Sequence, residues 1–351
     1  MAKNFILTID YELHLGNTTG SVFECMIEPT RRLMEILDRN QSKMTVFWDI
    51  LHYYKLLELQ DKYPVLKDDC RLIENQVKKM YEKGHDIQLH IHPHWLDAQY
   101  INDKWIFQYS RFSLKCLQPQ KDKTDINTIY GCIYQCKQLL QNFMNTFAPE
   151  YQVSTFRAGG YLIEPFSLVQ DALIENGITI DSSVCPGMSM EIVPFCFDFR
   201  GYPSRRYFVM NDLKKVAMQG KLTEYPITTV SIPIYYKIYF RLLFRLKYVK
   251  FLKELKGSGS CNSVSARKRK WYERFLFMFI RKEVSQLTPD VSFKEKINYL
   301  ISRSPEDSVM ILHPKFLNTH TYWILEDKIK KNQIYFQSIA LYEQNILQEK
   351  K

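Results

Sequence analysis

"HDIQLHIHPHW", residues 85–95, is the stretch that decides how this sequence is interpreted, because it holds four of the chain's eight histidines within ten positions. Apolar and polar residues alternate along it, so His90 and His92 lie on one face of an expected strand until Pro93 ends the ladder. His94 follows immediately. The stretch is therefore either a metal site at the end of a buried strand or a polar patch rich in imidazole.

Short β-type runs alternate with helix-type runs along the whole chain of 351 residues, which is typical of an α/β fold with parallel strands. The expected helices have apolar residues three and four positions apart, and Gly84 and Gly177 end two of them. Seven segments are expected to form strands: 4–12, 43–49, 85–92, 153–160, 178–183, 221–227 and 308–314.

Nearly every expected strand is apolar and then ends in a residue that can do chemistry. These residues are Asp10, Glu12, Asp49, His90 to His94, Arg157, Asp181, Glu224 and His313. In a parallel α/β barrel the carboxyl ends of the strands converge on one mouth, where active sites are found. An open doubly wound sheet would gather strand ends along a crevice, but no Gly-rich phosphate loop follows the first strand. A barrel is therefore the favoured fold.

A metal at this mouth is the first functional hypothesis, because a catalytic zinc site needs about three protein ligands and an open position for water. The histidine segment can supply two ligands, and Asp10 and Glu12 lie two residues apart on one strand face. A lone histidine on a strand is more often a satisfied polar residue, but three at alternating positions beside carboxylates favour a metal. Spacing alone leaves open whether His92 or His94 accompanies His90.

Six motifs, "LTIDYE", "TVFWD", "HDIQLHIHPHW", "FRAGGY", "IDSSV" and "MILHP", follow one another in an order that resembles the polysaccharide deacetylase family, the NodB-like enzymes of carbohydrate esterase family 4 type. The resemblance extends over about residues 4–230 and 290–317 and is strongest in the histidine segment. It implies a distorted (β/α)7-type barrel and one divalent metal ion, usually Zn²⁺. It also implies hydrolysis of an N-acetyl group on a sugar.

The resemblance assigns roles to particular residues. The family's His-x-x-x-His pair falls on His90 and His94, Asp10 matches the catalytic base, and Glu12 stands near the metal-binding carboxylate. The family commonly has two adjacent aspartates, whereas here Tyr11 separates Asp10 from Glu12. Glu12, His90 and His94 are therefore the expected metal ligands.

The remaining catalytic assignments are Arg157, which matches the arginine that holds the base, and His313, which matches the acid of the last motif. A metal-bound water loses its proton to the base, and a neighbouring cation keeps that base ionised. The acid then protonates the departing amine. The alternatives are structural: an Asp after a strand is often a helix cap, and an arginine there can form an ordinary ion pair. Asp181 and Glu224 fit either a supporting or a structural role.

The cysteines and the first residues of the chain indicate the compartment in which the protein is expected. The eight cysteines are scattered without a CxxC pair, and the first residues contain no apolar run like that of a signal peptide. We therefore expect a cytoplasmic protein. Residues 231–285 hold 14 Lys and Arg against 3 Asp and Glu, so the rest of the chain is nearly neutral.

The basic segment 231–285 interleaves aromatic and aliphatic residues with its charges, and "GSGSCNSVSARKRK" within it resembles a flexible loop. One interpretation is an amphipathic element on an anionic membrane surface, with the protein peripheral on the inner membrane face. The other interpretation is an additional helical segment that packs on the barrel and exposes its basic face to solvent. Nucleic acid is not an expected partner, because no recognition motif accompanies the charge.

Taken together, the sequence predicts one domain over residues 1–351, with a basic aromatic insertion at about 231–290 and a helical C-terminal tail at about 318–351. The predicted activity is metal-dependent removal of N-acetyl groups from an amino sugar or glycan, such as a surface polysaccharide or a lipid-linked precursor. The alternatives are hydrolysis of another non-peptide C–N amide bond and a catalytically inactive glycan-binding or scaffold protein.

Overall fold

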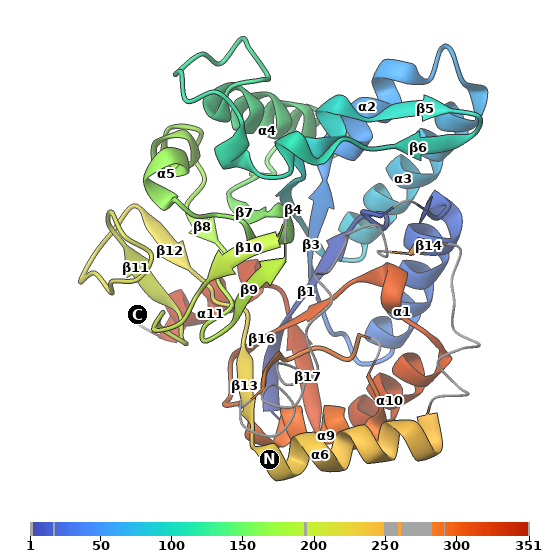
Figure 1. The fold of residues 1–351 in the computed structure, drawn as a ribbon, viewed down its shortest axis with the longest axis vertical. Helices are drawn as coiled ribbons and strands as arrows, with labels where there is room; N and C mark the ends of the chain where they lie inside the picture. Colours follow the sequence, from blue (N-terminus) through green and yellow to red (C-terminus); the bar gives the residue numbers. More distant parts are fainter. Residues whose placement is uncertain are drawn as a thin grey trace.

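A curled sheet of mainly parallel strands forms the centre of the molecule (Figure 1). The computed structural model describes residues 3–16, 18–192, 195–248, 259–260, 283–290 and 292–349. The strands follow the order β11-β12-β8-β7-β4-β3-β1-β16, and β17 pairs with β1 outside this path. Their bounds are β1 (Lys3–Tyr11), β3 (Thr45–Asp49), β4 (Asp86–Ile91), β7 (Thr155–Ala158), β8 (Ile180–Asp181), β11 (Tyr207–Val209), β12 (Leu222–Glu224), β16 (Ser308–Leu312) and β17 (Ile334–Gln337).

The strands β12, β8, β7, β4, β3, β1 and β16 are parallel neighbours, and each coincides with one of the seven segments expected from sequence, β1 beginning one residue earlier than expected. The remaining gap, between β12 and β16, is spanned by an isolated parallel bridge between Ile227 and Val309. The Thr228 N–H also donates to the Val309 carbonyl at 3.0 Å. The sheet is thus a distorted parallel barrel, which confirms the predicted fold class.

Helices cover the outside of this barrel (Figure 1). Local signals fix their ends: α3 begins at Pro64, where the missing N–H needs no partner, and Gly84 follows its C-terminus at a φ of +80°. The bounds are α1 (Glu28–Asp38), α2 (Ile50–Leu59), α3 (Pro64–Glu82), α4 (Ile129–Asn145), α5 (Phe166–Glu175), α9 (Lys294–Arg303), α10 (Thr319–Lys330) and α11 (Ile339–Glu349).

The core is one continuous cluster of buried apolar side chains that extends along the chain from Phe5 to Ile339. Every residue of β3, β4, β7 and β16 is buried, as expected for parallel strands that have side chains packed against both faces. A polar side chain at the end of such a strand therefore lies in a largely dry environment, where charges interact strongly.

Four two-stranded sheets extend from the barrel. They are β5 (Gln99–Ile101) with β6 (Lys104–Ile106), β9 (Ser189–Ile192) with β10 (Phe195–Asp198), β13 (Thr229–Ile232) with β15 (Glu283–Gln286), and β2 (Thr18–Thr19) with β14 (Gly259–Ser260). The predicted helical tail, 318–351, contains α10 and α11 but also β17, which adds to the edge of β1.

The basic insertion is described at its two ends, where it forms β13, α6 (Ile234–Leu243), the π-turn Phe244–Tyr248 that continues α6, and β15. Most of the predicted flexible loop, 257–270, lies outside the described residues. The aromatic residues of α6 pack on α9: Phe240 contacts Phe293 and Tyr299, with ring centroids 5.7 Å apart in both pairs. No helix in the described part of the chain is long and apolar enough to cross a bilayer.

Candidate active site

The carboxyl ends of the barrel strands assemble one buried polar cluster. The registers place Asp49 opposite His90 and His90 opposite Arg157, while Asp10 lies opposite Phe47 near the end of β1. Residues that are far apart in sequence therefore become neighbours, as the strand-end pattern predicted.

Arg157 is fully buried and holds the first carboxylate in place. Its Nη1 donates to Oδ1 of Asp10 at 2.5 Å, and its Nη2 donates to Thr8 and to the Ser182 hydroxyl at 2.9 and 3.0 Å. Its guanidinium also lies over the Phe47 ring, 4.1 Å from the centroid. Arg157 thus has a fixed position from which it neutralises Asp10.

The second oxygen of Asp10 faces His313. The His313 Nε2 lies 3.4 Å from Asp10 Oδ2, and the other ring nitrogen, Nδ1, lies 2.7 Å from Oδ2 of Asp290. The backbone N–H of His313 also donates to the Asp290 carboxylate at 3.1 Å. His313 is therefore held between two carboxylates.

These contacts separate the pKa values of the pair. Burial alone would raise the pKa of Asp10, but the charges of Arg157 and His90 and the bond from His313 hold it well below its usual range. Burial alone would lower the pKa of His313, but its hydrogen bonds to Asp10 and Asp290 raise that pKa to about 10. At neutral pH the pair is thus a carboxylate and an imidazolium.

A group of potential metal ligands lies beside this pair. One atom each from Glu12, His90 and His92 lie within 4.8 Å of one another, and all three residues are buried. Glu12 Oε2 is 3.4 Å from His90 Nε2 and 2.6 Å from His92 Nε2. These approaches lack hydrogen-bond geometry, and in the described part of the chain none of the three atoms has a hydrogen-bond partner.

Converging donor atoms without hydrogen bonds fit a divalent cation, because buried polar atoms otherwise find partners. The orientation of His90 agrees with this: its Nδ1 lies 2.8 Å from the carbonyl oxygen of Arg157, which can only accept, so Nδ1 carries a proton and Nε2 is the nitrogen that faces Glu12. Two imidazoles and a carboxylate are a donor set suited to zinc. A second group, Asp10, Glu12 and His313, satisfies the same distance limit.

Lys315 fixes the other oxygen of Glu12. Its Nζ donates to Glu12 Oε1 at 2.7 Å and to the carbonyl of Leu13 at 2.8 Å. Burial alone would raise the pKa of Glu12, but Lys315 and then His92 hold it well below its usual range. Glu12 is therefore ionised, with Oε1 engaged and Oε2 turned towards the imidazoles.

His94, the second imidazole that the family resemblance assigned, lies outside both groups. The strand ends at Ile91 and a short 3-10 turn, Pro93–Asp97, follows, so His94 turns away and its ring stacks on Phe112 with a centroid separation of 5.4 Å. Burial, and then the charge of His92, hold the pKa of His94 well below its usual range. Of the two alternatives that spacing left open, the geometry favours His92.

The first glycine of "FRAGGY", Gly159, is closely surrounded by other atoms. A Cβ on Gly159 would lie 2.5 Å from the carbonyl oxygen of Ile91 and 2.6 Å from Nδ1 of His92. Only glycine lets the chain after β7 approach β4 this closely. Gly159 therefore helps to set the position of the His92 ring.

Three further residues belong to the site, and only partial signals in the sequence pointed to them. Asp49 was recognised as a strand end; its Oδ2 accepts from the indole N–H of Trp95 at 2.7 Å, and burial raises its pKa. Lys315 and Asp290 were not recognised, because neither ends a predicted strand. Proximity to His313-Pro314 was the only available signal for Lys315.

Asp181 and Glu224 form a buried pair behind the site. Glu224 accepts from the N–H of Val184 at 3.1 Å, and Asp181 accepts from the Ser183 hydroxyl at 2.6 Å. Burial raises the pKa of both carboxyls, and their mutual repulsion adds to this for Glu224. They support the Ser182–Ser183 segment that binds Arg157, so they contact the site through other residues.

Comparison with known proteins gives likenesses of structure only: no family model and no curated protein matches the chain. A putative polysaccharide deacetylase from Mycobacterium smegmatis has a TM-score of 0.48 and 11% identity, over 100% of this chain and 92% of that one. A 4-alpha-glucanotransferase from Thermococcus litoralis has a TM-score of 0.42 and 16% identity, over 98% of this chain and 40% of that one. A probable polysaccharide deacetylase from Pseudomonas aeruginosa has a TM-score of 0.41 and 10% identity, over 95% of this chain and 87% of that one.

Proposed function

We propose that this chain is a metal-dependent hydrolase that removes N-acetyl groups from an amino sugar or glycan. One observation carries the proposal: the hydrogen-bond-free donor atoms of Glu12, His90 and His92 converge beside an ionised Asp10 that faces a protonated His313. A base, an acid and a metal-ligand set in one buried cluster are the parts that amide hydrolysis requires.

The mechanism follows from the ionisation states. A divalent ion at Glu12, His90 and His92, for which we propose zinc, would supply a water of lowered pKa and polarise the acetyl carbonyl. Asp10 Oδ2 is the base that would take a proton from the attacking water, while Arg157 binds Oδ1 and keeps the carboxylate oriented. His313 Nε2 then donates a proton to the departing amine, and Asp290 stabilises the imidazolium until that step.

The two roles are compatible because the environments of Asp10 and His313 push their pKa values apart, one down and the other up. A base that is always ionised and an acid that is always protonated near pH 7 need no rearrangement before reaction. The same arrangement could hydrolyse another linear amide, so the acetylated sugar is proposed from the motif resemblance and the amide chemistry from the geometry.

Metal content tests the proposal first. Purified protein should contain about one zinc or similar ion per chain by elemental mass spectrometry, and His90→Ala and His92→Ala should lose it. His94→Ala is the matched control, since its ring lies outside the ligand groups. Release of acetate from N-acetylglucosamine oligomers should follow metal content. Wild-type protein that stays metal-free after incubation with zinc would overturn the proposal.

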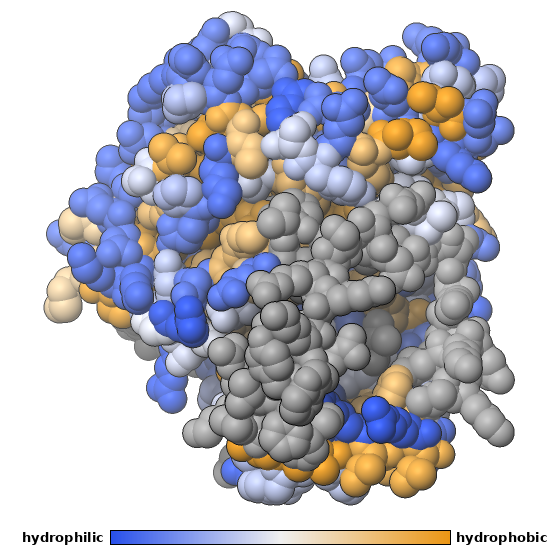
Figure 2. All heavy atoms as spheres, in the orientation of Figure 1, coloured by the Kyte–Doolittle hydropathy of each residue, from blue (hydrophilic) through white to orange (hydrophobic). Residues whose placement is uncertain are grey.

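We also propose that the chain rests on an anionic membrane surface through α6 and the turn after it. Tyr235, Tyr239, Leu242 and Leu246 form an outward stripe with 66, 47, 54 and 86% of their surface exposed. Figure 2 shows apolar residues gathered where α6 lies, at the lower end of the molecule, with hydrophilic residues beside them. An apolar ridge bordered by cations is the pattern of an interfacial helix.

Vesicle sedimentation tests this second proposal. The full chain should bind vesicles of phosphatidylcholine with phosphatidylglycerol, and Leu242→Gln with Leu246→Gln should weaken that binding. The matched control is Leu168→Gln on α5, where a leucine with 43% of its surface exposed lies away from the basic segment. Equal binding by all three proteins would exclude the α6 stripe as the contact. The cytoplasmic location stays a prediction from the sequence.

A further inference from the structure

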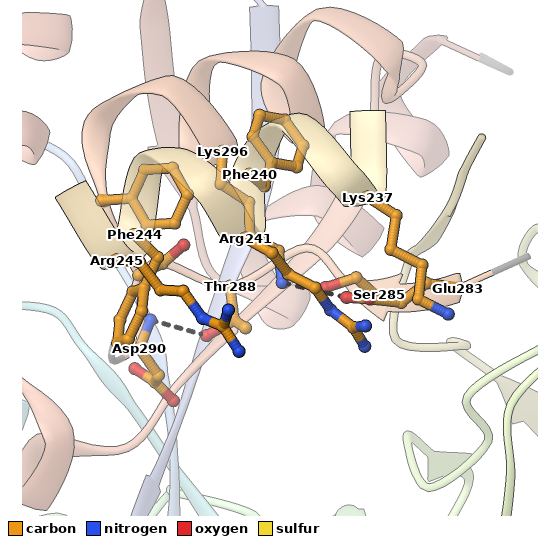
Figure 3. Close-up of a pocket in the computed structure, with 12 residues that line it drawn as sticks. Lys237, Phe240, Arg241, Phe244, Arg245, Glu283, Ser285, Thr288, Asp290 and Lys296 are labelled. Atoms are coloured by element: carbon orange, nitrogen blue, oxygen red, sulfur yellow. Dashed lines mark hydrogen bonds and ion pairs between the residues drawn. The ribbon is translucent and has the colours of Figure 1, made fainter. Parts of the chain in front are cut away.

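A cavity of about 470 Å³ lies between α6, β15 and the start of α9. Figure 3 shows Lys237, Arg241 and Arg245 extending from α6 and its continuation to one side. Among the described residues, six charged ones line the cavity: Lys237, Arg241, Arg245, Lys296, Glu283 and Asp290. Four cations and two carboxylates give this lining an excess of positive charge.

The carboxylates do not neutralise the arginines, because each already has another partner. Glu283 accepts from Lys296 at 3.3 Å, and Asp290 is held by His313 at 2.7 Å. Within the described part of the chain neither Arg241 nor Arg245 forms an ion pair. Two guanidinium groups that have no anionic partner among the described residues therefore face a cavity of the size that small ligands occupy.

The cavity and the active site share Asp290. This residue lines the cavity and also holds Nδ1 of His313, whose Nε2 faces the base Asp10. One side chain therefore separates the cationic cavity from the group that protonates the leaving amine. The cavity therefore adjoins the side of His313 that faces away from Asp10.

We propose that this cavity binds a phosphate or diphosphate group of the substrate, so that the enzyme acts on a phosphorylated N-acetyl amino sugar. This inference rests on the proposed deacetylase function. Guanidinium groups present planar pairs of N–H donors that match phosphate oxygens, and phosphate carries enough negative charge to balance two arginines. A neutral glycan would leave this charge uncompensated.

Calorimetry on the full chain tests the cavity without reference to catalysis, with inorganic pyrophosphate as the probe. The test variant is Arg241→Gln with Arg245→Gln. The matched control is Lys247→Gln with Arg303→Gln, which removes two positive charges from the same region; Lys247 pairs with Glu295, Arg303 lies over Tyr299, and neither residue lines the cavity.

The wild type and the control should bind pyrophosphate with similar affinity, and the test variant should bind at least about tenfold more weakly, because two charge-assisted contacts are lost. No binding by the wild type, or equal loss in the control, would overturn the proposal. Thermal denaturation of the test variant verifies that it is folded.

A substrate comparison separates the two proposals. Acetate release from N-acetylglucosamine 1-phosphate should exceed release from N-acetylglucosamine, and the double arginine variant should lose this preference. Failure to release acetate from either compound, with pyrophosphate binding intact, would count against the deacetylase function and not against the cavity. Equal release from both compounds would count against the cavity alone.

The phosphate has two chemical sources, a soluble nucleotide sugar and a lipid-linked sugar. UDP-N-acetylglucosamine in solution and undecaprenyl diphosphate N-acetylglucosamine in vesicles are the two probes that distinguish them. A preference for either diphosphate over the neutral sugar supports the cavity, and the stronger of the two identifies the source. No preference with either probe would overturn the proposal.

Discussion

Gly159→Ala is the substitution that most sharply tests the ligand set. The added Cβ would lie 2.5 Å from the Ile91 carbonyl oxygen and 2.6 and 2.7 Å from Nδ1 and Cγ of His92. Ordinary contacts for a Cβ begin at 3.4 Å, so the backbone of β4 and the His92 ring must together retreat by several tenths of an ångström. A catalytic constellation tolerates displacements of roughly 0.5 Å.

The expected effect on metal affinity follows from that displacement. Loss of support for a ligand typically weakens metal binding by about 10- to 100-fold. Forcing an extra methyl into a packed interior also costs about 1–3 kcal/mol of folding stability. Gly159→Ala should therefore lower both zinc affinity and thermal stability.

The matched control is Gly220→Ala, in the segment between β11 and β12. Its added Cβ would lie 2.1 Å from the carbonyl oxygen of Val209, so it is at least as crowded but away from the metal ligands. Zinc titration against a chromophoric chelator should show weaker binding for Gly159→Ala only, while urea unfolding shows a stability loss for both. Unchanged zinc affinity in a folded Gly159→Ala protein would refute the role of His92 and return the choice to His94.

The remaining predictions concern the charged residues of the site. Arg157→Lys should reduce kcat/KM for acetate release by at least about 100-fold and destabilise the protein by about 1–3 kcal/mol, because lysine keeps the charge beside Asp10 but cannot make all the hydrogen bonds that Arg157 donates to Asp10, Thr8 and Ser182. Kinetics and chemical denaturation measure the two effects. Asp290→Asn should lower the pKa of His313 from about 10 and move the alkaline limb of the pH–rate profile to lower pH. In metal-free protein, protonated His313 should contribute to the free energy of unfolding. This contribution should be complete below the unfolded pKa of 6.5 and lost as the pH rises through the folded pKa of about 10. Urea unfolding across that pH range should show a smaller loss for Asp290→Asn than for the wild type. Dialysis against a chelator should abolish acetate release, and zinc should restore it.

The sequence predicted the barrel because a parallel strand buried on both faces has a distinctive form, a short apolar run bounded by turn residues. The same regularity placed Asp10, His90 and Arg157 together, since each ends a neighbouring strand. Residues at strand ends can therefore be predicted from a single sequence wherever the strands themselves can be predicted.

The choice between His92 and His94 was not readable in the same way. It depends on the backbone after Pro93, where alternation stops and a 3-10 turn begins. Asp290 was equally hidden, because it reaches His313 from a loop that follows the long basic insertion, and no local pattern fixes where such a loop returns. The side chain of Lys315 is buried in the structure, whereas a lysine is expected at the surface when only the sequence is known.

In each of the two carboxylates at the centre of the site, Asp10 and Glu12, the two oxygens have different partners. Each has one oxygen bound by a buried cation: Arg157 holds Oδ1 of Asp10, and Lys315 holds Oε1 of Glu12. The remaining oxygens face different partners, Oδ2 towards His313 and Oε2 towards the imidazoles of His90 and His92.

This division explains how two neighbouring carboxylates perform different tasks without exchanging them. A carboxylate with one anchored oxygen cannot rotate to present the other oxygen to a new partner, so Asp10 remains available for protons and Glu12 for a cation. It also explains why the spacing Asp-Tyr-Glu is compatible with the proposed chemistry although the family commonly has adjacent aspartates. Lys315, which follows the last barrel strand in sequence, fixes Oε1 of Glu12. The long side chain of Glu12 then places Oε2 at the imidazoles of His90 and His92.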